Sequence, residues 1–67
     1  MTYDGYAMFE EGCYHIAHGN CQEAVIDRAE RVCKQIGARP LGFVAGVRNK
    51  LTLNCEIFTL EDLKQKS

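Results

Sequence analysis

The sequence lacks the long apolar run that a membrane-spanning helix needs, since no stretch of about 18 apolar residues occurs in it. It also lacks a basic excess: Lys and Arg number 8 against 9 Asp and Glu, which argues against nucleic-acid binding. The first residues, Met1 to Gly5, contain neither a basic nor an apolar segment. We therefore expect no signal peptide, a cytoplasmic location and reduced thiols, with neither membranes nor nucleic acids as partners.

Recognisable catalytic signatures are missing as well. The chain has no glycine-rich phosphate loop and no Ser-His-Asp order, and the adjacent Glu10 and Glu11 fit a solvated pair in a turn. At 67 residues it also offers little room for a deep pocket. We therefore expect a non-enzymatic protein without a resident cofactor, which acts by binding.

The composition is that of a folded domain. Hydrophobic residues make up 46% of the chain and charged residues 25%, so residues 1–67 are expected to form one small globular domain. A core of this size only narrowly offsets the entropy lost on folding. We therefore expect some further source of stability, and we favour a homodimer over a metal ion or a disulfide.

The clearest predicted element is an amphipathic helix over residues 21–36. Its apolar residues recur at helical spacing and form one stripe, made of Val25, Ala29, Val32, Cys33 and Ile36. Asn20 is expected to cap its first turn, and Gly37 to end it in the left-handed conformation. Pro40 then prevents the helix from continuing.

A β-hairpin is predicted after this helix. Apolar and other residues alternate over 41–47 and again over 51–57, on either side of the polar pair Asn49-Lys50. Asn49 tolerates a positive φ, which suits a two-residue turn.

Another hairpin is predicted before the helix. Residues 13–17 alternate as a strand, and the aromatic-rich segment 3–9 pairs with them through the turn at 10–12. Near the C-terminus, Thr59 is expected to cap a single helical turn.

These elements predict an α+β fold of order β-β-α-β-β, with an antiparallel four-stranded sheet, one helix on one face and a short C-terminal helical turn. The other face of the sheet would stay open and would suit docking to a larger protein or to a second copy of the chain. The residues expected to bind a protein there are His15, Ala17, Val44, Thr52 and Asn54.

The densest group of metal-binding residue types is Cys13-x-His15-x2-His18-x2-Cys21. Together these side chains are the ligand set of a Cys2His2 zinc site. An extended strand would direct His18 away from Cys13 and His15, and the spacing lacks a Cys-x2-Cys pair. The alternative is a strand with surface histidines and two unrelated cysteines, where Cys21 at the start of the helix is a candidate reactive thiol.

The other two cysteines, Cys33 and Cys55, fall on the predicted core faces of the helix and the last strand. Free cysteine packs as a small hydrophobic residue, which is sufficient to explain both. Four cysteines permit three complete disulfide pairings, and a Cys33–Cys55 bond would stabilise the fold in an oxidising compartment.

Along the chain stand Tyr14-x-Ile16-x3-Asn20, Arg28-Ala29, Cys33 and Gly37. This pattern resembles one found in small bacterial envelope domains of unknown function. In size and in order of elements, without shared motif residues, the chain also resembles small phage anti-CRISPR proteins.

Together these observations predict a small non-enzymatic binding protein of bacterial or phage origin. It would modulate or inhibit a larger protein stoichiometrically, as the anti-CRISPR resemblance implies. The alternatives are a zinc-binding or thiol-sensing module at Cys13, His15, His18 and Cys21, and a disulfide-stapled periplasmic domain.

Overall fold

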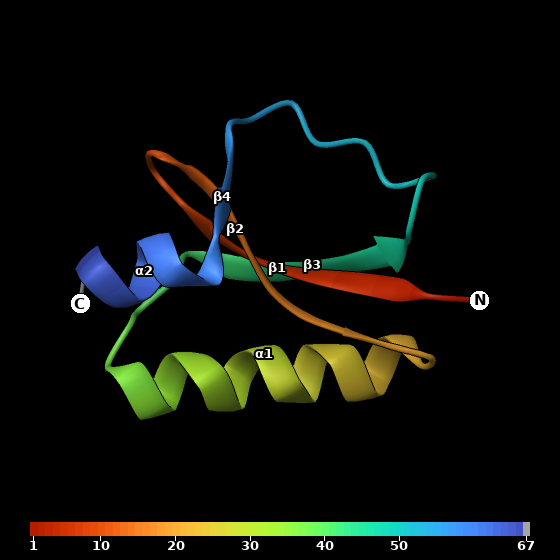
Figure 1. The fold of residues 1–67 in the computed structure, drawn as a ribbon, viewed down its shortest axis with the longest axis horizontal. Helices are drawn as coiled ribbons and strands as arrows, with labels where there is room; N and C mark the ends of the chain where they lie inside the picture. The colour runs from red at the N-terminus through yellow and green to blue at the C-terminus, as the bar shows by residue number, and fades with distance from the viewer. Residues whose placement is uncertain (67) are drawn as a thin grey trace.

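A computed structural model of the chain describes residues 1–66. Within these residues the fold is α+β, with a mixed sheet and two helices (Figure 1). In chain order the elements are β1 (Tyr3–Phe9), β2 (Gly12–Gly19), α1 (Gln22–Ile36), β3 (Gly42–Val47), β4 (Ile57–Thr59) and α2 (Leu60–Lys66).

The hairpin predicted at the start of the chain is confirmed. β1 and β2 pair antiparallel through a tight turn at Glu10 and Glu11. Gly12, which follows the turn, has φ 151°, a conformation that side chains rarely adopt. A Cβ at this position would also lie 2.5 Å from the carbonyl oxygen of Glu56, so only glycine lets the two segments approach this closely.

The predicted amphipathic helix is also confirmed, as α1. Its buried residues are Val25, Ala29 and Cys33, and they pack on one face of the sheet. Gly37 ends the helix with φ 74°, as predicted. The prediction of Asn20 as the cap is wrong, because the extended residue before the first turn is Cys21 and its side chain makes no capping hydrogen bond.

The sheet differs from the prediction in its second half. The strand order is β3-β1-β2-β4, so β3 pairs with β1 across the sheet and not with the segment that follows it. Of the expected last strand, 51–57, only Ile57 belongs to a regular strand, β4, which runs parallel to β2. The predicted purely antiparallel sheet and the hairpin of 41–47 with 51–57 are therefore wrong. Alternation showed that these segments are half-buried, but it does not identify a partner strand.

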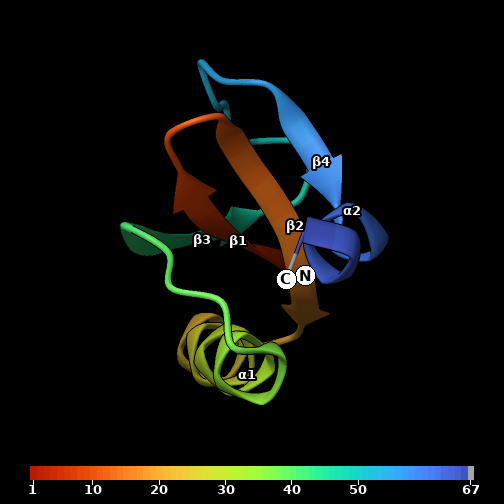
Figure 2. The same cartoon turned by 90° about the vertical axis from the view of Figure 1, so that its left-hand side faces the viewer.

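Residues 48–56 form an irregular segment, which we call the strap. It leaves the end of β3, where Asn49 has φ 72°, and crosses the sheet face opposite α1 before entering β4 (Figures 1 and 2). Leu51 of the strap lies against Gly46, since a Cβ on that glycine would be 3.0 Å from its side chain. The face predicted to be open is therefore partly covered.

The predicted C-terminal turn extends into the helix α2. Thr59 caps it: its hydroxyl accepts a hydrogen bond from the backbone N–H of Asp62 at 3.2 Å, and the Asp62 carboxylate accepts one from the Thr59 N–H at 3.0 Å. At the other end, Lys66 pairs with Glu11 of the first turn, which ties α2 to the hairpin. Among residues 1–66, neither helix has the length and apolar character needed to cross a membrane.

Candidate binding surface

The sheet face under the strap holds a buried charge. Asp4 is only 7% exposed, although it is a carboxylate on a strand of a small protein. Arg48, the first residue of the strap, donates hydrogen bonds to both of its oxygens, over 2.8 to 3.2 Å. On the neighbouring strand, the Nε2 of His15 lies 3.0 Å from Asp4 Oδ1. Two partners therefore offset the cost of burying this carboxylate.

This arrangement fixes the charge and orientation of its members. The hydrogen bonds from Arg48, more than those from His15, hold the pKa of Asp4 below its ordinary value, against the opposing effect of burial. Because a carboxylate only accepts hydrogen bonds, His15 donates from Nε2. Its ring also packs on Tyr6, with 5.1 Å between the ring centroids. The His15 imidazole is thus held in one orientation, with its side chain 37% exposed.

A second group with shifted pKa values surrounds the first turn. Glu11 accepts hydrogen bonds from Lys66 and from the hydroxyl of Tyr14, and these lower its pKa to about 2. The same bond from Tyr14 raises the pKa of that hydroxyl to about 12. Lys66 also lies over the Phe9 ring, 4.4 Å from its centroid. These contacts explain both pKa shifts, and their structural effect is to attach α2 to the hairpin.

Large apolar side chains are exposed at the same end of the sheet. Met8 is 39% exposed, Ile57 48% and Leu41 75%, and we call these three residues the turn-end patch. Met8 and Ile57 both flank Cys13 in the strand register, and the Leu41 N–H donates to the Met8 carbonyl at 2.7 Å. The patch therefore extends across the strands at one end of the sheet.

A disulfide between Cys13 and Cys55 lies within this patch and fastens the strap to β2. The pairing differs from the Cys33–Cys55 bond that we considered from the sequence. Cys33 keeps a free thiol on the buried face of α1, where desolvation raises its pKa. Contrary to the prediction, Cys55 does not lie in the core with Cys33, because it belongs to the strap, on the side of the sheet opposite α1.

The residues predicted to bind a protein have separate locations. His15 and Val44 lie on the strap side of the sheet, in register with Tyr6 between them. Ala17 is instead 5% exposed and belongs to the core. The β1–β2 register shifts after Gly5, and this irregularity turns Ala17 toward α1. Thr52 and Asn54 are exposed, but they lie in the strap and not on a strand.

The four residues of the predicted zinc site are in different environments. Cys13 is buried and disulfide-bonded, whereas His18 and Cys21 are exposed and His15 binds Asp4. The part of the chain that the structure describes contains no group of three or more His, Cys, Asp or Glu side chains placed to hold a metal ion. Because Cys13 ligates only as a thiolate, a zinc site at these positions stays a prediction for the reduced protein.

Sequence reasoning missed the two residues that organise this surface, Asp4 and Arg48. They are 44 positions apart, and each resembles an ordinary surface charge in the sequence. One signal was available: Asp4 stands in an aromatic-rich strand, where an acidic residue is unusual. No known protein family, no curated protein and no solved structure matches this chain.

Proposed function

We propose that this protein is a small non-enzymatic binding module that acts stoichiometrically on a larger protein through the turn-end patch and the adjoining strap-side face. Inhibition or modulation of that partner is the form of activity that fits a chain of this size. The proposal rests on one observation above all: exposed Met8, Leu41 and Ile57 gather at one end of the sheet.

Three features support this assignment. Scattered apolar side chains are common on any surface, but a cluster with polar neighbours is typical of an interface. The patch adjoins the next row of the sheet on the same side, which consists of Val44, Tyr6 and the oriented His15. The Cys13–Cys55 bond stiffens the patch, so that little conformational entropy is lost when a partner binds.

The test compares partner capture by matched variants. Tagged wild-type protein, Met8→Glu and Ile57→Glu are used to capture proteins from the source cell, and the captured partner is then titrated against each purified variant. With the tag placed at the N-terminus, Met1→Glu is the control, because Met1 is 82% exposed but lies outside the patch. We expect the two patch variants to lose affinity by at least about tenfold and Met1→Glu to keep it.

Light scattering on the same variants separates the two kinds of partner. A wild-type dimer that becomes monomeric in Met8→Glu would identify a second copy of the chain as the occupant of the patch. Equal capture of the same partner by wild type and both patch variants would contradict the proposal.

The disulfide favours a second candidate, a domain stapled in an oxidising compartment. Structural disulfides persist mainly outside the reducing cytosol, which differs from the location expected from the sequence. Native protein, denatured without reductant, would then show two free thiols, those of Cys21 and Cys33. Four free thiols would remove this candidate and favour the cytoplasm.

A further inference from the structure

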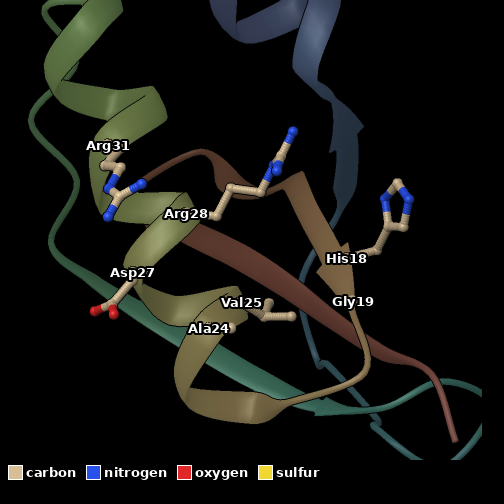
Figure 3. Close-up of a pocket in the computed structure, with 7 residues that line it drawn as sticks. All are labelled: His18, Gly19, Ala24, Val25, Asp27, Arg28 and Arg31. Carbon is tan, nitrogen blue, oxygen red and sulfur yellow. The ribbon is translucent and has the colours of Figure 1, made fainter.

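A groove lies on another side of the molecule, between the end of β2 and α1 (Figure 3). Its volume is about 400 Å³. Small residues, Gly19 and Ala24, form part of its wall together with the side chain of Val25. The groove therefore has more room than a single ion needs.

The charged side chains of this groove are predominantly basic and unpaired. Arg28 and Arg31 both line it, and within residues 1–66 neither makes an ion pair or a side-chain hydrogen bond. Figure 3 shows Arg28 reaching from α1 toward β2, while Arg31 and the carboxylate of Asp27 lie on the side of α1 farther from the strand. By contrast, Arg48, Lys64 and Lys66 all have carboxylate partners. The groove thus offers two guanidinium groups for an anionic ligand.

One edge of the groove is a strand with free backbone groups. β4 pairs with β2 only from Cys13 to His15, so the rest of β2 has no strand on its outer side. The direction of the backbone groups follows from the hydrogen bonds of β1. The backbone carbonyl of Thr2 accepts a hydrogen bond from the Arg48 N–H, and that of Met8 accepts one from the Leu41 N–H. Both bonds lie on the β3 side of β1.

The backbone groups of a strand point to alternate sides from one residue to the next. The even-numbered residues of β1, including Asp4, therefore direct their N–H and C=O groups toward β3. Their partners in β2 must then bond outward. This is observed at Cys13, which lies opposite Met8. The Cys13 N–H donates to the backbone carbonyl of Glu56 in the strap at 2.8 Å. By the same alternation His18, opposite Asp4, directs its N–H and its carbonyl away from the sheet, into the groove.

The opposite edge of the sheet is less available. On β3, Gln22 donates a side-chain hydrogen bond to the outward carbonyl of Ala45 at 2.8 Å. The carbonyl of Val47 is taken by the N–H groups of Lys50 and Leu51, each at 3.0 Å. An added strand would have to displace Gln22 there, whereas the β2 edge beyond His15 carries no such cap among the described residues.

We propose that the groove binds an acidic peptide segment in extended conformation. The segment pairs through its backbone with the free edge of β2 at His18 and places carboxylate side chains against Arg28 and Arg31. Backbone pairing requires a peptide, and the two unpaired arginines select acidic side chains. This site is separate from the turn-end patch, so the inference does not depend on the function proposed above.

The experiment titrates ¹⁵N-labelled protein with a capped hexapeptide of alternating Glu and Val, followed by amide chemical shifts. We expect the His18 and Gly19 amides to move on binding. Replacement of all Glu by Gln in the peptide, or Arg28→Gln or Arg31→Gln in the protein, is expected to weaken binding about tenfold or more. Lys34→Gln is the matched control, because it removes a charge from α1 outside the groove, and binding should change by less than about twofold.

Two further probes test the separate parts of the proposal. A Glu–Val peptide with N-methylated backbone cannot pair as a strand, and we expect it to bind at least about tenfold more weakly. Inorganic phosphate at matched ionic strength should not produce the shift at His18. Absence of binding at about 5 mM peptide, equal affinity of the methylated peptide, or equal weakening by Lys34→Gln would each overturn the proposal.

Discussion

At the scale of the single residue, Gly12 is a position where the fold leaves no room for a side chain. Its φ is 151°, and an added Cβ would meet both the Glu56 carbonyl oxygen and the Phe58 ring, at 2.5 and 2.8 Å. Gly12→Ala is therefore expected to lower the free energy of unfolding by about 2 kcal/mol or more, as measured by urea denaturation. Gly42→Ala is the control, because a Cβ there meets no atom within 4 Å, and it should have an effect below about 0.5 kcal/mol. Equal losses in both variants would contradict this account of Gly12.

Asp4 makes a residue-scale prediction about acid stability. Its pKa in the folded protein lies below the ordinary 3.8, chiefly because Arg48 hydrogen-bonds to the ionised form. Ionised Asp4 therefore stabilises the fold at pH values above that ordinary pKa, and this contribution disappears as the pH falls through the lower, folded value. Asp4→Asn should lower the free energy of unfolding by about 1–3 kcal/mol at neutral pH.

The acid dependence separates this effect from a packing defect. The difference between Asp4→Asn and wild type, measured by urea denaturation, should shrink as the pH falls from about 4 toward 2. His15, Arg48 and Tyr6 are the ionisable groups that contact or face Asp4. The pKa of Arg48 is raised by Asp4 and that of Tyr6 by burial, so Arg48 stays charged and Tyr6 stays neutral over this range. A difference that stays constant with pH would show that the carboxylate is not the stabilising group.

At the scale of the element, α2 depends on its first turn. Thr59 and Asp62 exchange hydrogen bonds between side chain and backbone, which satisfies groups that a helix start leaves unpaired. Thr59→Ala should cost about 1 kcal/mol and speed amide hydrogen exchange in α2. Thr52→Ala, at an exposed position of the strap, serves as the control and should leave exchange in α2 unchanged. Unaltered protection of α2 in Thr59→Ala would mean that Leu63, which is 1% exposed, holds the helix without the cap.

The elements also show what the sequence can predict. α1 and the β1–β2 hairpin were predicted because their signals are local: an apolar stripe with Gly37 at its end, and alternating segments around a short turn. β3 was predicted as a strand but with the wrong partner, and β4 was predicted to begin too early, because the strands they pair with are distant in the chain. Residues 51–57 alternate as a strand would, yet most of them form the strap, in which Leu51 packs against Gly46 of the sheet. Alternation of apolar and polar residues indicates that a segment is buried on one side. Many sheet topologies are consistent with that pattern, so it does not identify the partner strand.

The same limit applies to the candidate surfaces. His15 and Val44 were placed on the strap side of the sheet correctly by alternation, whereas a shift of register at Gly5 moved Ala17 to the core. The Asp4–Arg48 pair and the turn-end patch arise only when β3 and β4 join the hairpin. Long-range contacts of this kind leave no local pattern in the sequence.

At the scale of the whole molecule, stability depends on how the strap is held. The strap is fixed at its beginning by the Arg48–Asp4 ion pair and near its end by the Cys13–Cys55 disulfide. The disulfide joins residues 42 positions apart, so it encloses most of the chain, including α1 and β3. A covalent link over such a distance restricts the unfolded chain strongly, which matters most in a protein with a small core.

Removal of this bond should therefore destabilise the whole fold and not only the strap. We expect the double variant Cys13→Ser/Cys55→Ser, and wild type in excess reductant, to lose about 3–4 kcal/mol of unfolding free energy in urea. Cys21→Ser, at an exposed free thiol, should change the stability by less than about 0.5 kcal/mol. If the reduced protein instead unfolds at the same urea concentration and loses hydrogen-exchange protection only in residues 48–56, the strap is an independent unit and the core is stable without it. Since Met8 and Ile57 flank the bond, the first outcome also predicts that reduction weakens partner capture by the turn-end patch.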